Sequence, residues 1–134
     1  MAAMTEYTPG VCNIGPAEIR VRRRFGIVAS VAALALWIAL AVLNVPAPWR
    51  LLVFFPAAMG ATGFLQAAMH FCAGFGSRGL FNFGNEIGKT RSVEEEEFRS
   101  KDRRKAREIG LYSALAGLAV AVAAFLIPFA SSIP

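Results

Sequence analysis

The sequence predicts an all-α integral membrane protein with three transmembrane helices, a helical hairpin followed by a long third helix with a cytoplasmic extension. Two observations lead to this class. Hydrophobic residues make up 56% of the 134 residues, more than an ordinary soluble domain carries. Three long apolar runs also occur, at residues 25–45, 49–72 and 109–129. Each is long enough to cross a hydrocarbon core of about 30 Å at about 1.5 Å per residue.

The first two runs are predicted to form an antiparallel hairpin. Residues 25–45 carry no charge and follow a basic cluster. The run exceeds the apolar core of a signal peptide, roughly 7–15 residues, so we expect a retained span rather than a cleaved leader. Residues 45–49 read VPAPW, and two prolines in so short a segment leave room only for a tight turn. Trp49 and Arg50 are expected to anchor the second span at headgroup level.

The connection between the second and third runs has two parts. Residues 73–91 contain five glycines and three phenylalanines, which predicts an ordered surface loop. A highly charged segment begins at Ser92, three residues before Glu95, and this spacing is typical of a capping box at the start of a helix. No Gly or Pro break separates that charged segment from the third run, so one long continuous helix is expected.

Basic residues give the orientation. Of the 14 Lys and Arg residues, four lie at 20–24 and nine at 78–107, and Arg50 is the remaining one. Because basic loops stay in the cytoplasm, we expect a multi-pass protein with a cytoplasmic N-terminus and a non-cytoplasmic C-terminus. Abundant Ala and Arg with short loops fit a bacterial inner membrane. The expected parts are a cytoplasmic lead-in with a basic collar (1–24), a transmembrane hairpin (25–72), a cytoplasmic loop and charged helix (73–108), a third span (109–129) and a non-cytoplasmic tail (130–134). The expected partner of the basic collars is the lipid bilayer and not nucleic acid.

Two cysteines and a histidine form a candidate thiol or metal site. Cys12 precedes the first span and Cys72 ends the second, so the predicted hairpin brings both to the cytoplasmic side, with His70 nearby. Such a group could carry persulfide, exchange disulfides or hold a soft or borderline metal. The alternative is structural: each cysteine is a small buried apolar side chain, and His70 is a hydrogen-bonded residue at the membrane end. Three ligands without a fourth, and the absence of a C-x-x-C spacing, favour that alternative.

Polar residues inside the spans suggest a second candidate, a small polar cavity near the inner surface. Such residues usually face the interior of a bundle. A cavity of this kind could take a quinone headgroup, a lipid headgroup or a proton, although hydrogen bonds between helices also serve simply to hold them together. The candidate residues are Ser30, Thr62, Gln66, His70, Tyr112 and Ser113.

Small residues four positions apart mark faces along which helix backbones can approach closely. These pairs are Ala57 with Ala61, Gly63 with Ala67, Gly110 with Ala114 and Gly117 with Ala121. Three helices cannot use every such face among themselves, so we expect a protein partner or a homo-oligomer.

The segment Cys12 to Gly15, CNIG, is followed by an arginine cluster and by Gly26 at the start of a span. Together with Gly63, Phe64 and Cys72, it resembles the small two-helix membrane domain found alone or fused to rhodanese in bacterial inner-membrane proteins. The resemblance covers residues 12–75 and implies a helical hairpin with a link to sulfur handling, which only Cys12 and Cys72 could carry. The chain departs from that family by lacking a rhodanese domain and by adding the charged helix and a third span.

These observations favour a non-enzymatic accessory or assembly subunit that packs through its Gly and Ala helix faces and offers residues 92–108 to a cytoplasmic partner. The alternative is a thiol-based membrane protein that uses Cys12 and Cys72. No span carries Asp, Glu, Lys or Arg at its centre, which disfavours a small transporter or channel. The sequence predicts no catalytic residue and no cofactor, and leaves a metal open.

Overall fold

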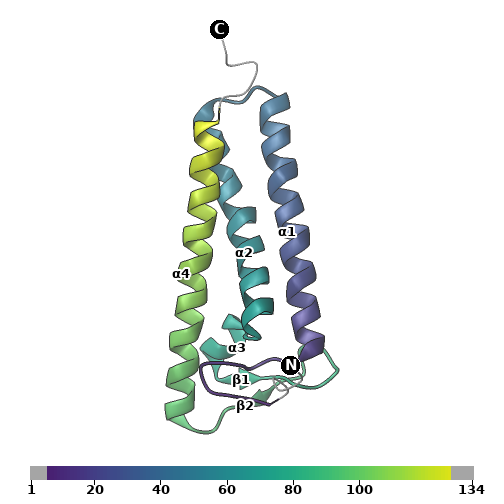
Figure 1. Cartoon of the computed structure of the whole chain (residues 1–134), viewed down its shortest axis with the longest axis vertical. Coiled ribbons are helices and arrows are strands. Elements are labelled where there is room, and N and C mark those ends of the chain that lie inside the picture. Colours follow the sequence, from purple (N-terminus) through teal and green to yellow (C-terminus); the bar gives the residue numbers. More distant parts are fainter. Residues whose placement is uncertain (1–5, 128–134) are drawn as a thin grey trace.

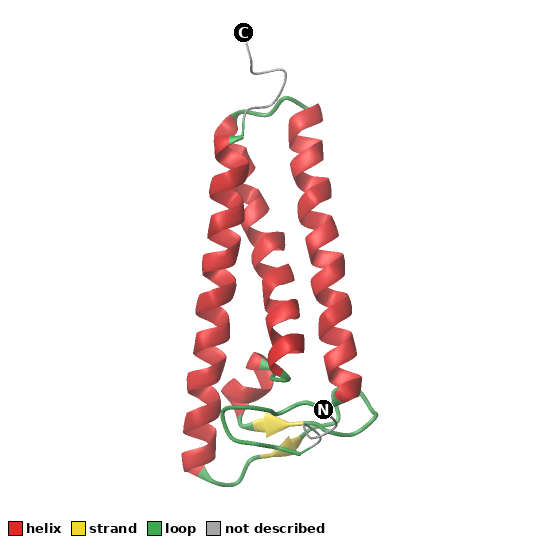
Figure 2. Cartoon of the chain, in the orientation of Figure 1, coloured by secondary structure: helices red, strands yellow, loops and turns green. Residues whose placement is uncertain are grey.

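The computed structural model describes residues 6–127, and three long helices dominate it (Figures 1 and 2). In chain order the elements are α1 (Pro16–Val42), the 3-10 helix η1 (Ala47–Val53), α2 (Phe54–Met69), α3 (Ala73–Arg78), β1 (Leu80–Phe81), β2 (Arg91–Ser92) and α4 (Glu96–Leu126). The short elements α3, β1 and β2 gather with the N-terminal segment at one end of the bundle, and the turn between α1 and η1 lies at the other (Figure 1). We call the first end the base, meaning residues 6–22 and 70–108.

The first helix is longer than the predicted span and takes up part of the expected lead-in. It begins at Pro16 rather than at residue 25, because a proline suits the first helical turn, where its missing N–H has no partner to lose. The basic cluster at residues 20–24 is therefore helical. The helix ends at Val42, and Asn44 then takes a φ of 54° as the chain reverses.

The second span joins two helix types. Residues 47–53 form a 3-10 helix after Pro46. The α-helix begins two residues before Pro56, whose backbone nitrogen carries no hydrogen to donate. The helix stops at Met69 and not at Cys72, because His70 adopts a left-handed conformation with a φ of 56°.

The segment 73–91 is more ordered than the predicted surface loop. It contains α3, and β1 pairs with β2 in an antiparallel register that places Leu80 opposite Ser92. The predicted capping box is wrong, since Ser92 is extended in β2 and Glu95 is the N-cap, without a side-chain capping bond. The pairing of the two strands outcompetes the local capping signal.

The charged segment and the third span form the single helix α4, 31 residues long, as the sequence predicts. Its last turn is hydrogen-bonded by Arg50 of the second span. Arg50, only 5% exposed, donates from Nη1 to the carbonyl oxygens of Phe125 at 3.1 Å and Ile127 at 2.6 Å. Arg50 thus satisfies carbonyls that a helix C-terminus leaves open, beyond the anchoring role expected for it. The predicted end of the span at residue 129 and the tail 130–134 lie outside the described residues.

Two glycines let the helices approach closely, with α2 packed against both α1 and α4. A Cβ added at Gly63 would lie 2.6 Å from the backbone nitrogen of Gly26 and 2.7 Å from the carbonyl oxygen of Arg22. A Cβ at Gly117 would lie 2.7 Å from the Cβ of Ala58. The α1–α2 and α2–α4 crossings therefore both depend on a missing side chain.

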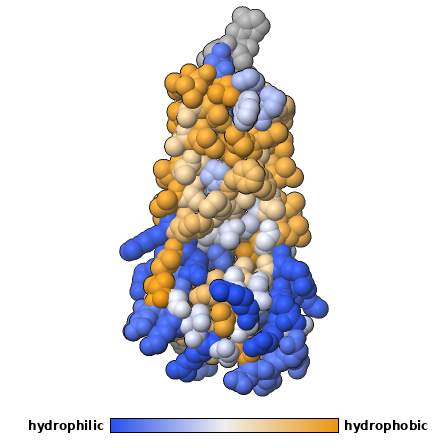
Figure 3. All heavy atoms as spheres, turned by 180° about the vertical axis from the view of Figure 1, so that it is seen from behind, coloured by the Kyte–Doolittle hydropathy of each residue, from blue (hydrophilic) through white to orange (hydrophobic). Residues whose placement is uncertain are grey.

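Three of the helical segments are long and apolar enough to cross a membrane: Pro16–Val42, Ala47–Met69 and Glu96–Leu126. At most 28% of each apolar stretch is buried inside the chain, so most of its apolar side chains face outward. Figure 3 shows this surface as a broad hydrophobic body above a hydrophilic base. An exposed apolar belt of this extent is typical of a protein surrounded by lipid.

Candidate functional site

Asn13 connects three segments of the base. It is fully buried, and its side chain accepts from the backbone N–H of Cys72 at 2.6 Å and donates to the carbonyl of the same residue at 3.1 Å. Its backbone N–H donates to the carbonyl of His70, and its own carbonyl accepts from Asn82 at 2.9 Å. The N-terminal segment, the end of α2 and the loop after β1 are therefore fixed through one residue.

Glu18 is a second buried hub, 1% exposed in the first turn of α1. Its Oε2 accepts from the side chain of Asn82 and from the backbone N–H of Gly88, each at 2.7 Å, and its Oε1 pairs with Arg22. A carboxylate in a first helical turn is also favoured by the helix dipole. The loop that contains Gly88 is thus held against a buried carboxylate of the base.

Asp102 holds the N-terminal segment against α4. It is fully buried, and its two oxygens accept from the hydroxyl of Tyr7 at 2.6 Å and from the backbone N–H of Gly10 at 2.7 Å. The ring of Tyr7 stacks on Phe81 with centroids 5.0 Å apart. Burial, with the hydrogen bond to Asp102 and its negative charge, raises the pKa of Tyr7 far above its usual range. Tyr7 therefore stays a neutral donor at physiological pH.

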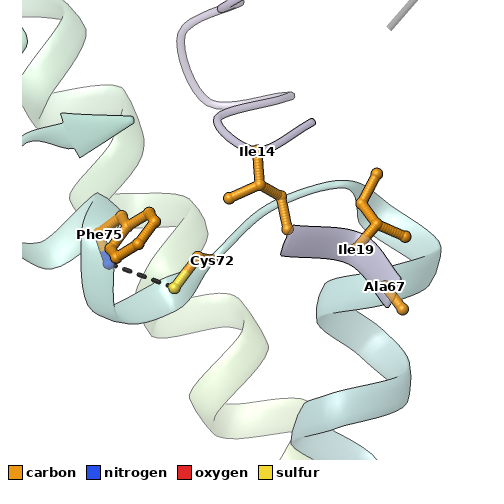
Figure 4. Close-up of a cluster of buried hydrophobic side chains, with 5 residues drawn as sticks. All are labelled: Ile14, Ile19, Ala67, Cys72 and Phe75. Carbon is orange, nitrogen blue, oxygen red and sulfur yellow. Dashed lines mark hydrogen bonds between the residues drawn. The ribbon is translucent and has the colours of Figure 1, made fainter. Parts of the chain in front are cut away.

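Cys72 lies at the N-cap of α3 and belongs to an apolar cluster with Ile14, Ile19, Ala67 and Phe75 (Figure 4). Its sulfur accepts from Nη2 of Arg22 at 3.0 Å and from the backbone N–H of Phe75 at 3.5 Å, the bond drawn as a dashed line in Figure 4. The Arg22 guanidinium also lies 5.3 Å from the centroid of the Phe75 ring. Cys72 is 6% exposed, so its sulfur accepts from two polar donors within a residue that is shielded from solvent.

Cys12 and His70 reach the same base by different routes. Cys12 is fully buried, its Sγ donates to the carbonyl of Ile14 at 3.6 Å, and burial raises the pKa of its thiol. Within the described chain Cys12 and Cys72 are not joined by a disulfide. His70 is half-buried and contributes its carbonyl to Asn13. Residues 6–127 contain no group of three His, Cys, Asp or Glu side chains that could hold a metal ion.

The six residues of the predicted polar cavity have different surroundings. Thr62 donates to the carbonyl of Ala58 in its own helix at 2.8 Å, and Gln66 accepts from the backbone N–H of Ala73 at 2.8 Å. Ser113 is buried at 3% exposure, and its hydroxyl makes no hydrogen bond within the described chain. The remaining three are the half-buried His70, the 48% exposed Tyr112, and Ser30, which lines an apolar groove of about 380 Å³ with Trp37 and residues of α4. These environments fit separate structural roles, in which the side chains bond to nearby backbone groups or pack between helices. They fit a single shared cavity less well.

Two polar pockets open on the surface of the base. The larger, about 600 Å³, is lined by β1, by the following loop and by Arg91. The smaller, about 320 Å³, lies between the N-terminal segment and α4. Sequence reasoning missed both pockets. It also missed Asn13, Glu18 and Asp102, because their roles depend on which distant segments surround them. The one available signal was Asp102 itself, an acid within an otherwise basic stretch of helix.

The chain matches no family model, no curated protein and no solved structure.

Proposed function

We propose that the protein is a non-enzymatic accessory or assembly subunit of a bacterial inner membrane. It crosses the bilayer three times, with the N-terminus and the base in the cytoplasm and the C-terminus on the other side. The basic residues in the base or directly next to it support this orientation, since 13 of the 14 lie at 20–24 or 78–107. A base whose loops are tied down by buried polar residues suits the presentation of a fixed surface more than a reaction.

The observation that carries the proposal is an unused close-packing face on α4. Gly117 and Ala121 are buried against the rest of the bundle, whereas Gly110 and Ala114 are exposed. A Cβ added at Gly110 would meet nothing within 4 Å. Glycine destabilises a helix by about 1 kcal/mol relative to alanine. A glycine that contacts nothing within its own chain is therefore explained best by the close approach of a helix from outside the chain. We infer that a transmembrane helix of a protein partner or of a second copy packs on this face.

The test compares two pairs of substitutions at exposed positions. Gly110→Leu with Ala114→Leu fills the proposed docking face, and Ala35→Leu with Ala39→Leu makes the same kind of change on an exposed face of α1. The proteins are extracted gently from native membranes and their particle masses are measured. We expect the wild type and the α1 pair to run as a complex and the α4 pair as a single chain. A wild type that is already monomeric, or equal loss in both pairs, would contradict the proposal.

Thiol chemistry is the second candidate, and the contacts of Cys72 favour it. A guanidinium nitrogen at 3.0 Å and a backbone N–H at 3.5 Å both point at its sulfur, and such surroundings occur around functional cysteines. Mass-tagged maleimide labelling in native membranes, with and without reductant, separates the two candidates. The assembly proposal predicts that Cys12 and Cys72 stay unlabelled until the protein is denatured. Labelling of either one that depends on reductant and changes when the other is replaced by Ser would favour the thiol function.

A further inference from the structure

The smaller pocket of the base gathers positive charge against a fixed backbone wall. Its lining comprises Pro9, Gly10, Lys101, Arg104, Lys105 and Glu108. This backbone segment is held in place because the N–H of Gly10 donates to Asp102 at 2.7 Å. It also packs closely on α4, since a Cβ added at Gly10 would lie 3.3 Å from the Cβ of Lys101. The N-terminal segment therefore forms one side of a standing pocket and α4 forms the other.

The pocket is suited to an anion. Three basic side chains face one acidic side chain, and Glu108 lies 3.8 Å from Lys105 as its ion-pair partner. The neighbouring Asp102 is fully buried, and both of its oxygens are already engaged by Tyr7 and Gly10. One carboxylate at 3.8 Å offsets only part of this charge, so the lining keeps a net positive charge, and Arg104 forms no ion pair among the described residues.

The depth of the pocket matches the headgroup layer of a bilayer. The apolar part of α4 starts at Ile109, so Arg104 and Lys105 lie about 6–8 Å below it at about 1.5 Å per residue. Each headgroup layer is about 5–8 Å thick, the difference between a core of about 30 Å and a full bilayer of about 40–45 Å. Lipid phosphates are the anions present at this depth.

The same face of α4 continues into the apolar layer. Residues three or four apart share a helix face, and the positions that follow Lys105 and Glu108 on it are Tyr112, Ala116 and Ala119. All three are exposed. A tyrosine at the interface followed by two small residues leaves a path for an acyl chain. This face lies on the other side of α4 from Gly110 and Ala114, so the inference does not rest on the proposed docking face.

We propose that this pocket binds an anionic phospholipid, with the phosphate held by Arg104 and Lys105 beside the Gly10 wall and an acyl chain along Tyr112 and Ala116. The phosphate oxygens of the headgroup supply negative charge to the basic side chains. The acyl chain covers the exposed face of α4 next to them. Zwitterionic lipids carry a compensating ammonium group and bind more weakly.

The test measures lipid binding by native mass spectrometry of the full-length protein in a mild detergent. Phosphatidylglycerol is titrated in, with phosphatidylcholine of the same chains and inorganic phosphate as comparison ligands. The pocket variant is Arg104→Gln with Lys105→Gln. The control is Arg23→Gln with Arg24→Gln, which removes the same charge directly before the apolar run that starts at residue 25, at exposed positions outside the pocket.

We expect the pocket variant to bind phosphatidylglycerol at least about tenfold more weakly and the control to bind it within about twofold of the wild type. Equal weakening in both variants would show a diffuse basic collar and overturn the proposal. Phosphatidylcholine binding as tightly as phosphatidylglycerol would overturn the charge argument. Inorganic phosphate binding as tightly as the lipid would assign the pocket to a soluble anion instead.

Discussion

A few buried polar side chains hold the base together, and Asn13 is the most connected of them. Its amide pairs with both backbone groups of Cys72 at the point where α2 ends and α3 begins, and the carbonyl of Cys72 also accepts from the N–H of Gly76 at 2.9 Å. Burial makes each of these bonds costly to lose, because an unpaired backbone group inside protein pays its full desolvation penalty.

Asn13→Ala should therefore lower the free energy of unfolding by about 1–3 kcal/mol, since it leaves the N–H of Cys72 unpaired and leaves its carbonyl with the N–H of Gly76 as donor. Asn85→Ala, in the exposed part of the loop, is the control and should change it by less than about 0.5 kcal/mol. Equilibrium unfolding in detergent measures both. A similar small effect for the two variants would mean that water replaces the Asn13 bonds.

Tyr7 makes the attachment of the N-terminal segment sensitive to high pH. Its pKa is raised in the folded protein, so its contribution to stability is complete below the unfolded value of about 10 and falls as pH rises above that value. The stability advantage of the wild type over Tyr7→Phe should therefore be about 1–3 kcal/mol at pH 8 and should shrink between about pH 10 and 11.5. Thermal unfolding at each pH measures it, with Tyr112→Phe as the control. An advantage that stays constant across this range would contradict the assignment.

At this scale the sequence reveals residue types but not their surroundings. The hairpin argument correctly places Cys12 and Cys72 at the same end of the bundle, where Asn13 links their segments. It could not show that Glu18 and Asp102 are buried, because burial of a charge depends on donors from distant segments, here Gly88 and Gly10. The local sequence pattern does not indicate those hydrogen-bond partners.

The helices themselves follow from apolar runs and prolines, and their packing follows from glycine. The run lengths predict three spans, while Pro16 and the left-handed His70 set helix ends that hydrophobicity alone does not define. The strands β1 and β2 escaped prediction because two-residue strands have no period to detect.

Two glycines in spanning helices should respond oppositely to alanine. Gly63→Ala places a methyl group 2.6 Å from the backbone of Gly26, so it should separate α1 from α2 and cost about 1–3 kcal/mol of unfolding free energy. Gly110→Ala meets nothing within 4 Å and should be neutral or stabilise the single chain by up to about 1 kcal/mol. Denaturation of the protein after a stronger detergent has separated it into single chains measures both. Equal stabilisation by the two substitutions would show that helix propensity, and not the close crossing, governs these positions.

The whole molecule consists of an apolar three-helix body with a polar base at one end (Figure 3). Hydrophobicity and the uneven distribution of basic residues predict this division from sequence alone, since both act through composition along the chain. The smaller pocket of the base could not be predicted in this way, because it forms between segments about 90 residues apart, such as those of Gly10 and Lys101.

The most direct test of this account is the side of the membrane on which each end of the bundle lies. Leu43→Cys, 72% exposed at the turn after α1, and Asn85→Cys, in the exposed loop of the base, are treated with a membrane-impermeant maleimide in intact and permeabilised cells. The wild type reports any reaction of its two buried cysteines. We predict that the cysteine at position 43 is labelled in intact cells and that the one at position 85 is labelled only after permeabilisation. Labelling of both positions from the same side would contradict a bundle that spans the membrane with its base in the cytoplasm.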